Sequence, residues 1–339
     1  MLHLAKLSSL SRRGILRNLE SPNFITSLTR FAPLVQIREY ASLNIKRGFM
    51  TNGGNRRSDF SVYDAFKRGL NIPGLTSDER PFSATGQGGQ YTKLTRPPKL
   101  WAPLDFDDSI SAALKFVEDL KEELSDCSAV EVAGLTEINK RTCESDIIKL
   151  FSLLVMHPVE IALKQIKLPD AHKINVRCEV HPEDGRAVRV DLVLEAENTE
   201  TKTVKVLAVM EMKNFGVIKD EMGHIMAAKV ASVQEAQKLA PTSKVRFLDD
   251  SMFLLRQCAA YATKFKTRHI GLCDWSVAIY LDFAQLPEAL AAKEEQEVED
   301  DGGFAGNFVL MYAQTNPDTF HYALLAFFKG AVDEWVQSF

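Results

Sequence analysis

An acidic and a basic side chain stand two residues apart in the apolar stretch LAVMEMKNFG, residues 207–216. Leu207 to Met212 is apolar enough to be a buried strand, and residues two apart on a strand point to the same face of the sheet. Glu211 and Lys213 should therefore lie side by side where that strand ends. They are either a partly exposed ion pair, worth at most ~1 kcal/mol, or half of a metal-dependent active site.

A second carboxylate, Asp191, occurs in VRVDLVL, early in the preceding strand of the expected hairpin. Antiparallel pairing brings the start of one strand to the end of the next, so Asp191 and Glu211 should converge at one edge of the sheet. Converging carboxylates repel each other unless a cation lies between them, and hard oxygen ligands suit Mg²⁺ or Mn²⁺. A neighbouring lysine, Lys213, can orient or deprotonate a water where the site lowers its pKa. These groups could hydrolyse a phosphodiester with a metal-activated water, although the bare pattern also arises by chance.

Two expected helices carry polar residues that could complete such a site. Glu144 shares a helical stripe with Ile148 and Val155, and a carboxylate on a core-facing stripe needs a partner such as a metal. The alternative for Glu144 is a first-turn acid that the helix dipole stabilises. Gln257 and Tyr261 are one turn apart on the helix after the Glu-x-Lys strand, so they share a face. On its own, a polar pair of this kind is usually a hydrogen-bonded pair at the edge of a helix face.

The order of these residues resembles the PD-(D/E)XK nuclease superfamily, which includes restriction enzymes and RecB-like exonucleases. The resemblance rests on a helix glutamate, the strand VRVDLVL, the EMK tripeptide and QCAAY on the next helix. It implies that Glu144, Asp191 and Glu211 hold one or two Mg²⁺ ions, and that Lys213 handles the attacking water. It also implies that the glutamine and tyrosine of QCAAY support the site or contact the scissile strand.

The resemblance covers residues 135–283 and implies a restriction-endonuclease-like core of order αβββαβ, with a mixed central sheet flanked by helices. It departs from the family pattern at Val190, where the proline of the family's name would stand. The layout is also similar to fungal PD-(D/E)XK-like domain proteins. The implied function is a Mg²⁺-dependent nuclease on DNA or RNA. The alternative is a catalytically inactive module of the same scaffold that binds protein or nucleic acid.

The periodicity of the sequence predicts the elements that must position these residues. Helices are expected at 109–124, 142–157, 221–239, 251–266 and 320–339, and strands at 173–181, 187–197, 204–213, 269–274 and 276–283. This order is typical of an α/β sandwich around a mixed sheet. Thr142 should begin the second helix, which should end before Pro158, and Asp250 or Ser251 should cap the helix of QCAAY. An acidic loop is expected over 288–301.

The N-terminal part of the chain has a different composition. Residues 1–57 carry ten Lys or Arg against two Glu, and this basic amphipathic start resembles a mitochondrial transit peptide. The alternative is a disordered basic tail. Residues 58–100 are rich in Gly, Ser, Thr and Pro and are expected to be a flexible linker with a short helix at 60–70. A single nuclease-like domain is expected over 101–339, in the mitochondrial matrix or otherwise in the nucleus or cytoplasm.

Charge and cysteine content restrict the possible functions further. The chain has a net charge of −4, and residues 1–57 contribute +8, so the remainder carries −4 − 8 = −12. A body of that charge is not a general nucleic-acid coat, because phosphate binding requires positive surface. Five cysteines without a CxxC pair argue against a disulfide framework and a thiolate zinc site. No apolar run approaches the roughly 20 residues of a membrane-spanning helix, so no membrane partner is expected.

One small basic cluster, KFKTRH at residues 264–269, lies at the end of the helix that carries QCAAY. It could contact a phosphate backbone. Cations that favour a helix C-terminus explain it equally well.

Overall fold

A computed structural model of the chain describes residues 60–70, 90–130, 144–180, 189–296 and 303–339. All of these belong to one compact unit, residues 57–339. The basic segment 1–57, with its expected transit peptide, and Thr142, the expected helix cap, both lie outside the described residues.

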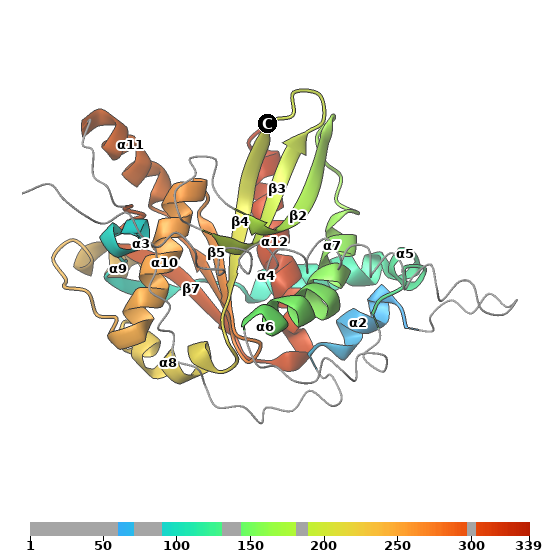
Figure 1. Cartoon of the computed structure of the whole chain (residues 1–339), viewed down its shortest axis with the longest axis horizontal. Helices are drawn as coiled ribbons and strands as arrows, with labels where there is room; N and C mark the ends of the chain where they lie inside the picture. The colour runs from blue at the N-terminus through green and yellow to red at the C-terminus, as the bar shows by residue number, and fades with distance from the viewer. Residues whose placement is uncertain (1–59, 71–89, 131–143, 181–188, 297–302) are drawn as a thin grey trace, which may run out of the picture. The chain divides into compact units, whose positions relative to one another are not determined.

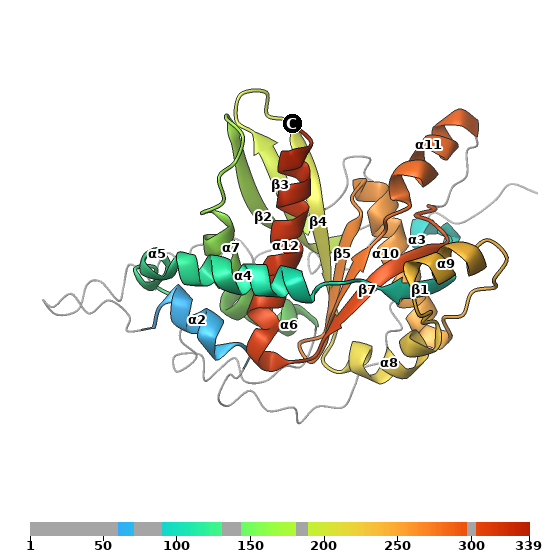
Figure 2. The same cartoon turned by 180° about the vertical axis from the view of Figure 1, so that it is seen from behind.

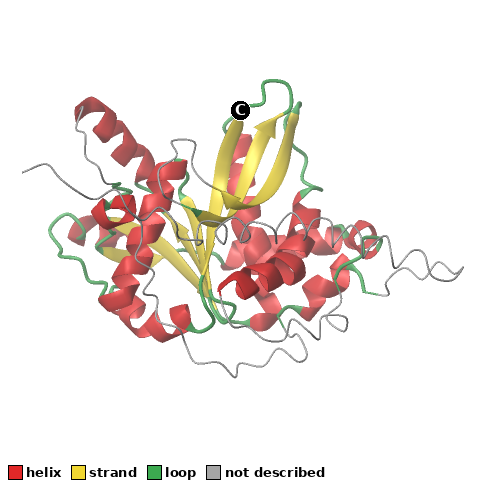
Figure 3. Ribbon diagram, viewed as in Figure 1, coloured by secondary structure: helices red, strands yellow, loops and turns green. Residues whose placement is uncertain are grey.

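Within the described residues, one seven-stranded mixed sheet runs through the unit, with helices on both of its faces (Figure 1 and Figure 3). The strands are β1 (Leu100–Pro103), β2 (His172–Val180), β3 (Val190–Asn198), β4 (Val204–Met212), β5 (His269–Cys273), β6 (Ala278–Asp282) and β7 (Phe308–Gln314). Their spatial order is β1-β7-β6-β5-β4-β3-β2. The pairs β1–β7 and β4–β5 are parallel, and the other four are antiparallel. The predicted α/β class with a mixed sheet flanked by helices is confirmed.

The helices form two layers, one on each face of the sheet. They are α2 (Val62–Arg68), α3 (Gln90–Leu94), α4 (Asp107–Asp119), α5 (Lys121–Ser125), α6 (Glu144–Phe151), the π-helical segment η3 (Ser152–Met156), α7 (His157–Leu163), α8 (Val217–Ala227), α9 (Val233–Leu239), α10 (Asp249–Phe265), α11 (Leu286–Gln296), the 3-10 turn η4 (Pro317–Thr319) and α12 (Phe320–Gln337). α10 and α8 cover one face, and α12, α7, α4 and α2 contribute to the core on the other (Figure 2). None of these described helices has the length and hydropathy needed to span a membrane.

Alternate residues of the central strands point to the two helical layers. Leu192 and Met210 are register partners that pack in the core with α12, whereas the next pair, Val193 and Val209, packs with α10 and α8. Burying a side chain of this size stabilises the fold by roughly 1.5–3 kcal/mol. Because both faces are covered, β3 and β4 are apolar at almost every central position, as the sequence shows.

The expected helix over 221–239 is wrong, because the chain forms two helices there, α8 and α9. The intervening residues run along the edge strand β1 instead. The Trp101 N–H donates to the Ala228 carbonyl (3.1 Å), and the Val230 N–H donates to the Trp101 carbonyl (2.9 Å). An edge strand exposes unpaired backbone groups, and this segment satisfies those of Trp101.

The helix expected to end before Pro158 continues past that proline. α6 leads into the π-helical segment η3, and Pro158 then lies in the first turn of α7, where its missing N–H costs little. The wider turn changes which carbonyls are bonded within the helix. Within this π-helical segment, the Leu154 carbonyl lies 3.0 Å from Nε2 of the fully buried His321 on α12.

The segment expected to be a flexible linker, 58–100, contains the short helix expected at 60–70, which is α2, and also the unexpected helix α3 and the first residue of β1. Ser61 and Asp64 form a capping box at the start of α2, and Phe66 of that helix is fully buried in the core. The folded unit therefore begins before Trp101. The described part of the expected acidic loop is also helical, since it belongs to α11.

Two further helix boundaries differ from the sequence analysis. The helix expected at 109–124 is divided at Leu120 into α4 and α5. The expected cap at Asp250 or Ser251 is wrong, because α10 begins at Asp249. The carboxylate of Glu221 on α8 accepts from the Ser251 N–H (3.0 Å), so a neighbouring helix satisfies this backbone donor.

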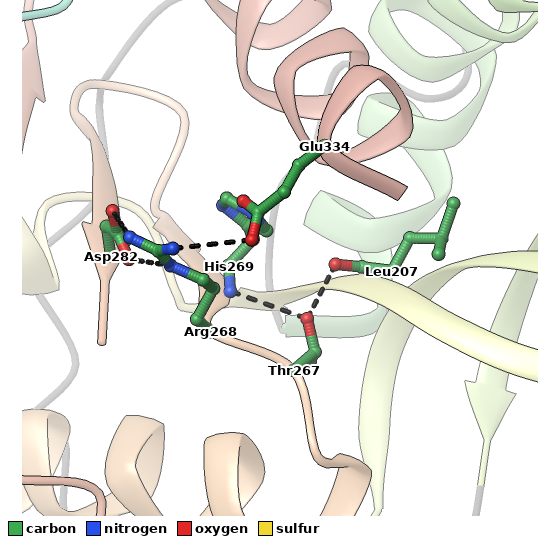
Figure 4. A network of polar contacts seen from close by, with 6 residues as sticks. All are labelled: Leu207, Thr267, Arg268, His269, Asp282 and Glu334. Atoms are coloured by element: carbon green, nitrogen blue, oxygen red, sulfur yellow. Dashed lines mark hydrogen bonds and ion pairs between the residues drawn. The ribbon is translucent and has the colours of Figure 1, made fainter. Parts of the chain in front are cut away.

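A polar network of Thr267, Arg268, His269, Asp282 and Glu334, here called the Glu334 network, joins α12 to β5 and β6 (Figure 4). Arg268 donates to both carboxylate oxygens of Asp282 (2.6 Å each) and to Glu334 (3.3 Å). Nε2 of His269 lies 2.9 Å from the other oxygen of Glu334. The hydrogen bond with His269, supported by the charge of Arg268, lowers the pKa of Glu334 to about 2. The basic cluster KFKTRH therefore uses its arginine within the fold.

Candidate functional site

The β3–β4 hairpin places Asp191 and Glu211 at the same edge of the sheet. Asp191 directly precedes Leu192, and Glu211 directly follows Met210, the register partner of Leu192. Residues opposite each other on an antiparallel pair project from the same face. The two acids accordingly lie on the face that α10 covers, and the structure brings them together as the hairpin argument predicts.

Glu211 is the centre of the site and has three side-chain donors. Nζ of Lys213 lies 2.6 Å from Oε1, the Gln257 amide donates to the same oxygen (2.8 Å), and the Tyr261 hydroxyl donates to Oε2 (2.9 Å). The side chains of Glu211 and Lys213 are only 7% and 13% exposed. This is therefore a buried ion pair with additional hydrogen bonds rather than the weak surface pair that the sequence left open. We call these four residues and Asp191 the Glu211 network.

The backbone around Glu211 is fixed from both sides. Oδ2 of the buried Asp191 accepts from the Met212 N–H (2.7 Å), which ties β3 to the end of β4. The Lys213 N–H donates to the Cys273 carbonyl of β5 (2.7 Å). Glu211 lies between these two attachments, so its backbone position is held by both neighbouring strands.

α10 supplies Gln257 and Tyr261 from a single face, as their spacing predicts. The Gln257 amide donates to the Tyr261 hydroxyl as well as to Glu211, and that hydroxyl also lies 3.2 Å from the Arg189 carbonyl. Burial raises the pKa of Tyr261 well above its usual value, and the negative charges of Glu211 and Asp191 raise it further. The phenol therefore stays protonated at neutral pH and acts as a hydrogen-bond donor to Glu211.

A buried cysteine next to Gln257 does not act as a nucleophile. Burial raises the pKa of the Cys258 thiol, and the charge of Glu211 adds to this effect. A thiolate is the reactive form of cysteine, so Cys258 is inert in this position. The described cysteines Cys127, Cys178, Cys258 and Cys273 are all free thiols.

The sequence analysis missed the contacts that backbone groups make with the site. The Met212 N–H and the Arg189 carbonyl both bond to site side chains, and no residue pattern marks a backbone donor or acceptor. Glu144 is the first residue of α6, which packs against β4. Its side chain lies outside the described residues, so its expected place among the ligands stays a prediction.

The described side chains include no group of three or more His, Cys, Asp or Glu gathered closely enough to hold a metal ion. Two carboxylates, Asp191 and Glu211, do lie together on one face, and both are buried. Oxygen donors of this type suit Mg²⁺ or Mn²⁺, which often take one or two carboxylates from the protein. The donor set therefore fits a hard divalent cation in kind, with Lys213 at present supplying the positive charge beside Glu211.

Comparison with known proteins identifies no relative of this chain. No family model matches it, and no curated protein or solved structure is significantly similar. The contacts of the site itself are therefore the basis for its function.

Proposed function

We propose that the protein is a metal-dependent nuclease with a restriction-endonuclease-like core, which hydrolyses phosphodiester bonds of DNA or RNA. The observation that carries this proposal is Glu211, held by Lys213, Gln257 and Tyr261 with Asp191 on the same sheet face. The order of α6, β2, β3, β4, α10 and β5 supports it, with α8 and α9 inserted before α10.

Each residue of the site would have a distinct role. Asp191 and Glu211, together with Glu144, would hold Mg²⁺ or Mn²⁺, which supplies Lewis-acid stabilisation and lowers the pKa of a bound water. Lys213 would orient the attacking water and offset the negative charge that develops on the phosphate. Gln257 and Tyr261 would fix the carboxylate of Glu211 through their hydrogen bonds.

Lys213 has a second role in the protein without substrate. Its ammonium offsets the charge of Glu211 at 2.6 Å, so the buried carboxylate has a cationic partner. If Glu211 held a divalent cation, the ammonium of Lys213 would be available to a water or a phosphate oxygen.

The second candidate is an inactive module that keeps the nuclease scaffold for binding. It is favoured by the completeness of the hydrogen bonding around Glu211, which is stable through protein donors alone. The charge of −12 outside residues 1–57 also favours it, because a polyanion is repelled by such a body.

The two candidates differ in one assay. The purified full chain is incubated with labelled single-stranded DNA, duplex DNA and RNA, in Mg²⁺ and in EDTA. Cleavage in Mg²⁺ and none in EDTA is expected for the nuclease. Glu211→Gln and Asp191→Asn should each reduce the rate by on the order of a hundredfold or more, since even outer partners of a metal contribute 10–100-fold.

Glu195→Gln is the matched control for these variants. Glu195 is a buried acid on the same strand as Asp191, but it pairs with Arg177 away from the site (3.3 Å), so the variant should cleave normally. Folded wild-type protein that cleaves none of the substrates would contradict the nuclease. If that protein still binds one of them, the inactive module is the better description.

A further inference from the structure

α10 carries an exposed aromatic ring beside the Glu211 network. Phe253 is 51% exposed and lies one helical turn before Gln257, which donates to Glu211 (2.8 Å). Residues four apart on a helix are neighbours on its surface. The ring of Phe253 is therefore at the border of the candidate site.

Single exposed phenylalanines are common on protein surfaces, but this one has an arginine over its ring. The guanidinium carbon of Arg256 lies 5.4 Å from the ring centroid of Phe253. Nε of Arg256 is buried without a hydrogen-bond partner, and its Nη2 makes only a long contact of 4.0 Å with the Met252 sulfur. In the part of the chain that the structure describes, Arg256 pairs with no carboxylate.

Arg256 differs in this respect from other arginines of the fold. Arg268 is held by both oxygens of Asp282, and Arg177 pairs with Glu195, so their charges are offset within the protein. Among the described side chains, no carboxylate offsets the charge of the Arg256 guanidinium, which lies over the exposed ring of Phe253. Planar guanidinium groups bind phosphate oxygens and stack on flat rings.

The charge of the body decides which nucleic acid suits these two residues. Duplex binding draws most of its free energy from many cations that neutralise phosphates, and residues outside 1–57 carry −12. A single strand carries half the phosphate charge of a duplex per unit length, so it is repelled less, and its unpaired bases can stack on an aromatic ring with an arginine beside it. An exposed phenylalanine with one unpaired arginine therefore favours a single strand over a duplex.

We propose that Phe253 and Arg256 form a binding site for an unpaired nucleobase and its adjoining phosphate, so that the protein binds single-stranded nucleic acid in preference to duplex. The proposal rests on the proposed function in that it takes nucleic acid as the substrate. Binding at Phe253 does not require cleavage, so the two are tested separately.

The test measures binding of the full chain in EDTA, where no cleavage occurs. Fluorescence anisotropy compares a fluorescein-labelled oligothymidylate with the same strand annealed to oligoadenylate. The single strand should bind more tightly, and Phe253→Ala should weaken its binding about tenfold. Phe253→Trp should restore it, whereas Phe253→Leu, which keeps an apolar side chain but has no π face, should be as weak as Ala. Arg256→Gln should weaken binding and lower the salt dependence by about one phosphate contact.

Leu114→Ala, which removes an exposed apolar side chain from α4, is the control and should bind as the wild type does. Equal binding of duplex and single strand would overturn the proposal, as would wild-type binding by Phe253→Ala. Retention of binding in Phe253→Leu would show general apolar contact, and a changed oligomeric state in Phe253→Ala would show a protein-docking face. Either result also overturns it.

Cleavage data keep this proposal distinct from the proposed function. Phe253-dependent binding in EDTA, without cleavage in Mg²⁺, would contradict the nuclease and support the base-binding site. Cleavage that depends on Glu211 but not on Phe253 would support the nuclease and contradict the base-binding site.

Discussion

Two polar networks lie at opposite ends of the same parallel strand pair, β4 and β5. Met212 pairs with Cys273 at the end that carries the Glu211 network, and Ala208 pairs with His269 at the end that carries the Glu334 network. In the Glu334 network, an arginine and a histidine face two carboxylates (Figure 4). In the Glu211 network, as far as the described side chains show, the ammonium of Lys213 pairs with Glu211, and Asp191 lies beside Glu211 on the same sheet face.

Burial separates the central glutamates of the two networks, although Asp282 of the Glu334 network is as buried as Lys213. The Glu334 side chain is 52% exposed, and ion pairs of exposed groups contribute about 0–1 kcal/mol each. The Glu211 side chain is 7% exposed, so its charge is desolvated and must be compensated inside the protein. A fold gains little from gathering two buried acids at one sheet edge. The Glu334 network is thus arranged for structure, whereas the Glu211 network is arranged at a cost that a ligand-binding function would explain.

The largest effect should come from removing the cation of the Glu211 network. Lys213→Met leaves Glu211 buried without its ammonium, and breaking a buried pair in this way costs about 3–5 kcal/mol. The melting temperature, followed by circular dichroism, should fall accordingly. Mg²⁺ should raise the melting temperature of Lys213→Met more than that of the wild type, because the cation replaces the lost charge. An equal response of both proteins to Mg²⁺ would count against a metal site at Glu211.

The next largest effect should come from His321, which is fully buried and has no ion-pair partner among the described residues. Burial lowers the pKa of His321 to about 4 from its usual 6.5. Between these values the unfolded chain binds the proton and the folded protein does not, so the free energy of unfolding falls as pH falls. Over this window the loss is about 3 kcal/mol. His321→Gln keeps a donor for the Leu154 carbonyl but does not titrate, so its urea unfolding should depend less on pH.

His224→Gln is the control for that pH series, because His224 is partly exposed and lies outside the core. Because solvent reaches its ring, replacing His224 should change the slope between pH 6.5 and 4 less than replacing the buried His321 does. A wild-type slope in His321→Gln would show that other groups dominate the acid response.

A smaller effect is expected from Tyr261, one of the two neutral donors to Glu211. Tyr261→Phe removes the hydroxyl that donates to Glu211 and should cost about 1–3 kcal/mol, since a hydrogen bond to a charged group is lost. Tyr280→Phe is the matched control. The Tyr280 hydroxyl is also buried but has no hydrogen-bond partner in the described part of the chain, so its removal should cost little. Equal costs in urea denaturation would mean that the bond to Glu211 contributes nothing.

The sequence predicted the Glu211 network well, because its geometry is local. A hairpin fixes the register of β3 and β4, so Asp191 and Glu211 must meet, and helical spacing places Gln257 beside Tyr261. The α/β class followed from the same periodicities. The position of Glu144, the third expected carboxylate, depends on how α6 packs against the sheet. Helical periodicity alone cannot place its side chain.

Features that depend on long-range pairing were missed or predicted wrongly. The break between α8 and α9 exists because Trp101, far away in sequence, needs backbone partners at its strand edge. The helix α2 was predicted at 60–70, but as part of a linker, because its core contacts are with helices that are distant in the sequence. The partners of Arg268 are likewise distant in the sequence, so phosphate binding by the cluster KFKTRH was left open. In the structure, Arg268 pairs with Asp282 and Glu334 instead.

The smallest effect should come from the Glu334 network. Glu334→Gln removes the contacts with Arg268 and His269, and because the carboxylate is half exposed the cost at neutral pH should be below about 1 kcal/mol. The pKa of Glu334 is lowered to about 2, so its contribution is present above the unfolded value of 4.5 and disappears as pH falls toward 2. The difference between wild type and variant should therefore vanish in acid and shrink in high salt. A cost as large as that of Lys213→Met would erase the distinction between the half-exposed Glu334 and the buried Glu211.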